Sequence, residues 1–210
     1  MDKQIKLAID SGEMLPLMEA FYTIQGEGYY SGKAAYFLRI GGCDVGCHWC
    51  DVKESWDADL HPPTLLSDIL KEISIYPVDT VVVTGGEPLM WNLDKLTNAL
   101  KDMGLKVHLE TSGAYPISGS FDWICLSPKK MQFPLDKIKP MVNEFKVIIN
   151  NKHDFDWAET QREGLSDNCK LYLQAEWSKR EKVIPLIIAF IKENKHWAIS
   201  LQSHKYMNIP

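Results

Sequence analysis

Three closely spaced cysteines constrain this chain more than any other feature of its sequence. Cys43, Cys47 and Cys50 follow an apolar run at residues 35–40, in a C-x3-C-x2-C spacing. Thiolates this close together can bind one face of a metal centre, and soft sulfur ligands select zinc, copper(I) or an iron–sulfur cluster. A closed structural zinc site takes four protein ligands, whereas three thiolates on a four-iron cluster leave one iron open to an outside ligand. Three cysteines therefore favour the cluster.

A zinc site is the alternative reading of the same loop. His48 lies inside the motif and would supply a fourth ligand. However, the side chains of residues 47, 48 and 50 can hardly all reach one small ion with tetrahedral geometry. No second Cys or His pair with metal-ligand spacing appears elsewhere to complete such a site.

Bulk properties exclude several classes of protein. The net charge of −5 and the pI near 5.7 argue against a nucleic-acid partner, which would require a basic face. No apolar run is long enough for a transmembrane helix, and residues 1–25 have no signal-peptide core. An odd number of cysteines, three of them clustered, predicts reduced thiols in the cytoplasm, with Cys125 and Cys169 as structural thiols.

Hydrophobic periodicity predicts alternating strands and helices in one domain, residues 1–210. Residues 1–18 are expected to be an irregular or strand-like lead-in. Thr64 and Asn92 are the expected N-caps of two helices, and Pro185 is expected to kink the last helix or mark its start. The predicted strands are 34–40, 79–83, 106–110, 123–126, 145–149, 171–174 and 197–202, and the predicted helices are 65–73, 93–103, 154–161 and 179–194.

This order predicts an α/β fold with a parallel sheet and right-handed crossovers. The segments before strands 123–126 and 145–149 are short and interrupted by glycine or proline, so neither leaves room for a long helix. The expected architecture is a partial, helix-poor β/α barrel. Ligand sites in such folds form at the carboxyl ends of the strands, where the cysteine loop and the other polar motifs of this chain lie.

A second motif, GGEP at residues 85–88, directly follows a predicted buried strand. Together with the cysteine motif, it resembles the signature of the radical S-adenosylmethionine (SAM) superfamily. The resemblance implies a [4Fe-4S] cluster on Cys43, Cys47 and Cys50, SAM on its open iron, and an external electron donor. The cofactor-binding residues it implies are Trp49, Asp51, Gly85, Gly86, Glu87, Ser112, Ser127, Lys129, Gln174 and Trp177.

Further segments narrow the resemblance. Residues 21–28, Arg39, Cys50-Asp51, residues 110–113 and residues 202–205 resemble the 7-carboxy-7-deazaguanine synthase family over essentially the whole chain. The resemblance implies a radical ring contraction of 6-carboxy-5,6,7,8-tetrahydropterin to 7-carboxy-7-deazaguanine, with loss of ammonia, on the route to queuosine. SAM and the cluster carry the reaction, so no protein side chain is assigned as catalytic. Two alternatives stay open: an activase of glycyl-radical enzymes, and a non-catalytic iron–sulfur or zinc module.

The substrate implied by this resemblance is a carboxylated pterin. Arg39 offers a planar, bidentate donor for its carboxylate, and Glu27 an acceptor for its guanidine-like edge. From the stretch around Glu27 alone, an ordinary β-turn is the simpler reading. The substrate-binding residues implied are Ile24, Gln25, Gly26, Glu27, Arg39, Thr84, His204 and Pro210.

One position departs from the family pattern. Members often carry Thr or Ser after the Cys-Asp pair, where the hydroxyl binds a magnesium ion, but here the residue is Val52. Mg²⁺ prefers oxygen ligands, so the expected Mg²⁺ is the least supported of the implied cofactors. The resemblance also implies a homodimer.

Overall fold

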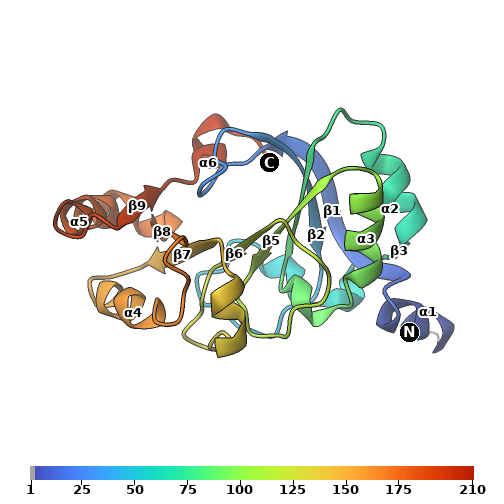
Figure 1. Cartoon of the computed structure of the whole chain (residues 1–210), viewed down its shortest axis with the longest axis horizontal. Helices are drawn as coiled ribbons and strands as arrows, with labels where there is room; N and C mark the ends of the chain where they lie inside the picture. The colour runs from blue at the N-terminus through green and yellow to red at the C-terminus, as the bar shows by residue number, and fades with distance from the viewer. Residues whose placement is uncertain (1–2) are drawn as a thin grey trace.

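A computed structural model describes residues 3–210 and contains one curved, nine-stranded sheet (Figure 1). The strand order is β3-β1-β2-β4-β5-β6-β7-β8-β9. β1 (Met14–Ile24) runs antiparallel to both β2 (Ala34–Ile40) and β3 (Pro63–Leu65). From β2 onward every pairing is parallel, as predicted. The remaining strands are β4 (Thr80–Gly85), β5 (Lys106–Thr111), β6 (Trp123–Leu126), β7 (Glu144–Ile149), β8 (Lys170–Ala175) and β9 (Trp197–Ser200).

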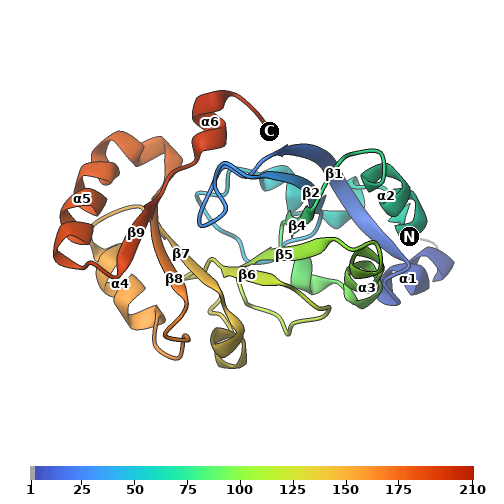
Figure 2. The same ribbon diagram turned by 45° about the horizontal axis from the view of Figure 1, so that its top comes forward.

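Except for the short C-terminal helix, which lies at the opening of the curve, the helices lie outside the curved sheet, and β1 and β9 stay apart, so the barrel is partial (Figures 1 and 2). Between β5 and β7 the only helical segment of the described chain is a 3-10 helix, Asp136–Met141, in agreement with the predicted shortage of helices. The α-helices are α1 (Lys3–Asp10), α2 (Leu66–Ile73), α3 (Asp94–Asp102), α4 (His153–Gln161), α5 (Arg180–Glu193) and α6 (Ser203–Met207).

Strand alternation separates the core from the site. On β2, Tyr36, Leu38 and Ile40 are almost completely buried in the core, whereas Phe37 and Arg39 point the other way and line a cavity. This is the period-two pattern of a strand with two different faces. The same sheet therefore packs against helices outside and offers polar side chains inside.

The expected lead-in was wrong for much of its length. Residues 3–10 form α1 and residues 14–18 begin β1, whereas residues 1 and 2 lie outside the described residues. Gly12 has φ +72°, and its N–H donates to the carbonyl of Ile9. A glycine in this left-handed conformation is a common helix stop, so the sequence did contain a signal for α1.

Two expected caps differ in outcome. Thr64 lies in β3, and its hydroxyl donates to the Pro62 carbonyl, so Thr64 does not cap α2. Asn92 does accept the Asp94 N–H at 3.0 Å, although Leu93 is the residue next to α3. The prediction of Thr64 failed because pairing with β1 holds its backbone in the sheet.

In the C-terminal region the structure decides between the two alternatives for Pro185 and corrects the end of one strand. α5 begins at Arg180, so Pro185 lies inside the helix and does not mark its start. The strand expected at 197–202 ends at Ser200, and α6 follows it. α6 is held by a tertiary contact, since the N–H and hydroxyl of Ser203 both donate to the Gly26 carbonyl at 2.9 Å.

Within residues 3–210, no helix is long and apolar enough to cross a membrane.

Candidate active site

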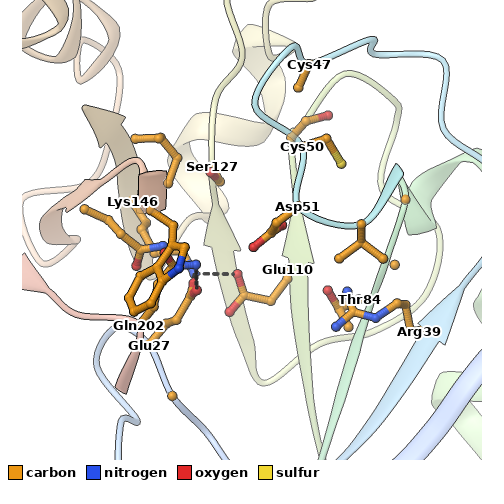
Figure 3. Close-up of a pocket in the computed structure, with 18 of the residues that line it drawn as sticks. Glu27, Arg39, Cys47, Cys50, Asp51, Thr84, Glu110, Ser127, Lys146 and Gln202 are labelled. Carbon is orange, nitrogen blue, oxygen red and sulfur yellow. Dashed lines mark hydrogen bonds and ion pairs between the residues drawn. The ribbon is translucent and has the colours of Figure 1, made fainter. Parts of the chain in front are cut away.

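The carboxyl ends of the parallel strands open into a cavity of about 490 Å³. Loops after six strands contribute to its lining, which is the arrangement expected at this edge of an α/β sheet. Figure 3 shows Cys47 and Cys50 at one end of this pocket, with Glu27, Lys146 and Gln202 on one side and Arg39 and Thr84 on the other. Every residue predicted to bind a cofactor or the substrate lines this cavity.

The cysteine loop and the GGEP turn are packed directly on each other. A Cβ atom on Gly86 would lie 2.4 Å from the Gly42 carbonyl oxygen and 2.7 Å from the Cβ of Cys43. The Glu87 N–H donates to that same Gly42 carbonyl at 2.9 Å. Only a glycine lets the two backbones approach this closely. The two motifs, far apart in sequence, therefore form one wall of the cavity.

The cysteines fit a cluster in their donor chemistry. All three thiols are free, and all three line the cavity. Burial raises the pKa of Cys43 to about 11 and also raises that of Cys47, where Lys129 opposes the increase. Without a bound metal the thiols of Cys43 and Cys47 hold their protons, and binding of iron would release them. In residues 3–210, no three Cys, His, Asp or Glu side chains are arranged as ligands of a single ion.

Glu87 is directed into the protein. Its side chain is buried, and its carboxylate accepts hydrogen bonds from the Leu89 N–H, the Thr111 hydroxyl and both the N–H and the hydroxyl of Ser112. Both oxygens are thus used within the chain. The carboxylate joins the loops after β4 and β5, and the backbone of this turn is what remains available to a ligand.

A buried lysine joins two carboxylates at the floor of the cavity. The Nζ atom of Lys146 lies 2.7 Å from Glu27 Oε2 and 3.0 Å from Glu110 Oε2, with its side chain only 5% exposed. Glu27 also accepts from Gln202 Nε2 at 3.0 Å. β1, β5 and β7 each contribute one charge, either directly or through the loop that follows.

The charges in this group stabilise one another. Burial would raise the pKa of Glu27, but the ammonium of Lys146, together with His204 and Gln202, outweighs burial and lowers this pKa to about 2. Burial opposes the charge of Lys146 as well, yet the surrounding thiol and carboxylates hold its pKa well above the ordinary value. The floor of the cavity therefore carries an ionised Glu27–Lys146 pair at neutral pH.

The loop at residues 25–33 connects β1 and β2 and reaches across to the other end of the sheet. The Gly28 N–H donates to Ser200 Oγ at 3.0 Å, and the Tyr29 N–H donates to Glu144 Oε2 at 3.2 Å. A Cβ on Gly26 would lie 2.1 Å from His204 Nδ1, so this glycine allows the imidazole to approach. These contacts bring Glu27 and His204 to the same cavity.

Arg39 is oriented by an acidic partner. Its Nε donates to Glu19 Oε1 at 2.5 Å from the neighbouring strand β1. Held in this way, the guanidinium faces the cavity beside Thr84, with which it pairs in the sheet register. A fixed planar donor suits a carboxylate ligand.

Aromatic and basic groups gather at the end of β8. The guanidinium of Arg180 stacks over the ring of Trp177 at 4.2 Å, and Tyr206 contacts the same ring edge-on at 5.1 Å. Gln174 accepts from Ser200 Oγ at 2.6 Å. In the loop after β6, Lys129 Nζ donates to Ser127 Oγ at 2.6 Å. Both residues line the cavity, and burial lowers the pKa of Lys129.

Sequence reasoning missed Lys146, Glu110, Gln202 and Lys205 as individual site residues. The sequence did contain a signal for a functional or paired charge at Lys146, because this lysine lies among the apolar residues of a buried strand, residues 144–149. A charged residue in such a strand is costly unless it is paired, and pairing here involves two distant strands. The other three acquire meaning only from the partners that the tertiary structure brings to them.

Comparison with known proteins agrees with this geometry. The sequence model that describes the radical SAM superfamily matches residues 38–159 of this chain. The chain is 58% identical to a 7-carboxy-7-deazaguanine synthase of Flavobacterium psychrophilum, over 99% of both chains. It is 47% identical to a 7-carboxy-7-deazaguanine synthase of Synechocystis sp., over 92% of this chain and 93% of that protein.

A solved structure supports the same relationship. The crystal structure of QueE from Escherichia coli superimposes with a TM-score of 0.83 and 29% identity, covering 94% of this chain and 98% of that one. The match therefore extends over nearly the whole of both chains. The chain therefore belongs to the 7-carboxy-7-deazaguanine synthase family of radical SAM enzymes.

Proposed function

We propose that this enzyme converts 6-carboxy-5,6,7,8-tetrahydropterin to 7-carboxy-7-deazaguanine with loss of ammonia, in the cytoplasm and as a homodimer. The observation that carries the proposal is the division of one cavity into two chemically different ends. A three-cysteine loop lies at one end, and fixed carboxylates and a fixed guanidinium lie opposite. When bound, the [4Fe-4S] cluster and SAM supply the radical that begins the ring contraction.

The residues of the chain bind and orient the two ligands. Cys43, Cys47 and Cys50 hold the cluster, and the backbone of the GGEP turn contacts the methionine end of SAM. Ser112, which donates to Glu87, and the Ser127–Lys129 pair would contact the ribose and carboxylate of SAM. Trp49, Asp51, Gln174 and Trp177 would flank the adenosine.

Substrate orientation follows from the charged groups. Arg39 receives the pterin carboxylate, while Glu27 and Glu110 accept N–H groups from the guanidine-like edge. The carbonyls of Gln25 and Gly26 already accept hydrogen bonds within the chain, which leaves the two carboxylates as the principal acceptors. Such an arrangement fixes the reacting carbon against SAM and excludes water.

Two further groups complete the substrate side. His204 approaches Glu27, and burial lowers its pKa, so the imidazole is neutral at pH 7 and can donate or accept. The carbonyl oxygen of Pro210 accepts from the Thr23 hydroxyl at 3.4 Å, which holds Pro210 at the cavity wall. Both are assigned to substrate binding.

The test is anaerobic reconstitution with iron and sulfide, followed by dithionite, SAM and 6-carboxytetrahydropterin, with products identified by mass spectrometry. We expect 7-carboxy-7-deazaguanine without stoichiometric loss of SAM, and no product from Cys47→Ser, which removes one cluster ligand. A wild-type protein that cleaves SAM but leaves the pterin unchanged would overturn the assigned substrate and favour an activase. A colourless zinc protein would overturn both.

Arg39→Lys is expected to raise KM for the pterin about tenfold with a smaller change in kcat, because an ammonium cannot make the bidentate contact. Glu19→Gln, which leaves the guanidinium in place but loosens its orientation, serves as the matched variant and should have a smaller effect. Steady-state kinetics on the reconstituted enzymes measures both. An unchanged KM in Arg39→Lys would remove Arg39 from the carboxylate site.

A further inference from the structure

A divalent cation does not fit the residues beside Asp51. Val52, the next residue, has no side-chain oxygen, and its carbonyl already accepts from the Ser55 N–H at 3.1 Å and the Ser55 hydroxyl at 2.7 Å. Mg²⁺ takes an octahedron of oxygen ligands, of which a protein typically supplies one or two and water or substrate the rest. With the Val52 carbonyl engaged by Ser55, the Asp51 carboxylate is the protein oxygen ligand that this Cys-Asp-Val segment offers.

Asp51 already has a cation of its own. Lys205 Nζ lies 2.6 Å from Asp51 Oδ2, and the lysine side chain is 21% exposed against 56% for the aspartate. The residues come from distant parts of the chain, the cysteine loop and α6. An ammonium at this distance makes a charge-assisted hydrogen bond with one of the two Asp51 carboxylate oxygens and neutralises the charge that would attract a metal ion.

The ammonium is held in place by its surroundings. Its Nζ lies 5.1 Å from the centre of the Trp177 ring, and the Lys205 N–H donates to the Gln202 carbonyl at 3.0 Å. α6 is attached to the β1–β2 loop through the two hydrogen bonds from Ser203 to Gly26. A cation that is fixed by a helix, a ring and a carboxylate at once is a built feature of the cavity rim.

We propose that the ammonium of Lys205 takes the place of the divalent cation, so that this enzyme binds its substrate without Mg²⁺. The inference rests on the proposed function, since it concerns the same substrate site. Asp51 and Lys205 together carry no net charge, whereas a carboxylate with a divalent ion would carry a net positive one. The positive charge for the pterin carboxylate must then come from Arg39.

A manganese titration of the reconstituted holoenzyme tests the cation site without any substrate. Free Mn²⁺, followed by its EPR signal, should show no stoichiometric binding to the wild-type protein. Val52→Thr/Lys205→Met, which restores a hydroxyl and frees the aspartate, should bind about one ion per chain. Stoichiometric binding by the wild type, or none by the double variant, would overturn the proposal.

Turnover provides the second measurement. Wild-type kinetics should be the same in excess EDTA and in excess Mg²⁺. Lys205→Met should raise KM for the pterin about tenfold, because the unpaired Asp51 then repels the substrate carboxylate. Mg²⁺ should restore this KM only in the double variant Val52→Thr/Lys205→Met. Lys195→Met, at an exposed lysine outside the cavity, is the charge-matched control and should behave as wild type.

The two measurements distinguish a failure of the cation proposal from a failure of the proposed function. Loss of wild-type turnover in EDTA with recovery in Mg²⁺ overturns the replacement by Lys205. If no protein converts the pterin, the proposed function fails, and the manganese titration still decides whether Lys205 excludes the ion.

Discussion

Lys146→Met is expected to lower the free energy of unfolding by about 3 kcal/mol and to reduce turnover about 100-fold. The substitution preserves most of the side-chain volume but removes the only charge that lies between Glu27 and Glu110 in the described hydrogen-bond network. Two carboxylates would then face each other at the floor of the cavity without a counter-ion. Urea unfolding and steady-state kinetics measure the two effects.

The pH dependence distinguishes this electrostatic role from a packing role. In the wild type, the lowered pKa of Glu27 contributes stability that is complete above its ordinary value of 4.5 and is lost as the pH falls toward about 2. In the variant, burial raises the pKa of Glu27 without opposition from the lysine, so protonation relieves the repulsion at higher pH. The stability difference between the two proteins should therefore shrink as the pH falls from 7 to 4.

Two further variants serve as controls. Lys146→Arg keeps the charge and should retain most of the stability. Glu27→Gln/Lys146→Met removes one of the unpaired carboxylates and should recover stability while activity stays low, because the substrate acceptor is lost as well. A stability difference independent of pH, or no recovery in the double variant, would mean that Lys146 contributes by packing.

Gly85→Ala is expected to destabilise the protein by about 2–4 kcal/mol and to weaken SAM binding while leaving the cysteines in place. Gly85 has φ +149°, and a Cβ there would lie 2.0 Å from the Ile40 carbonyl oxygen. That oxygen also accepts the Gly86 N–H at 2.9 Å, so relieving the clash separates the GGEP turn from the cysteine loop. Urea unfolding measures stability, and the SAM-induced change in the EPR spectrum of the reduced cluster measures binding.

Gly104→Ala is the matched control for Gly85→Ala. Gly104 also has a positive φ, +78°, but a Cβ there would meet no atom within 4 Å. Gly104→Ala should lower the free energy of unfolding by about 1 kcal/mol, which measures the strain of the left-handed backbone alone, and SAM binding should not change. Equal losses in the two variants would show that the close approach to Ile40 has no energetic consequence.

Elements defined by local patterns were predictable from the sequence. The apolar runs of β4 and β7 predicted buried parallel strands, and the scarcity of helices between β5 and β7 followed from glycine and proline positions. α6 was not predictable in this way. It has only five residues, too few to be stable alone, and it is held by hydrogen bonds to a loop near the other end of the chain.

The same distinction separates the two halves of the site. The cysteine motif and the GGEP turn could be recognised because their chemistry depends on residues close together in sequence. The Glu27–Lys146–Glu110 group and the Asp51–Lys205 pair join residues that lie far apart along the chain. No local pattern specifies such pairs, because a buried charge is stable only beside a partner that the fold delivers. The sequence by itself determined the family and predicted the cofactor ligands, and only the tertiary structure decided which charges meet at the floor of the cavity.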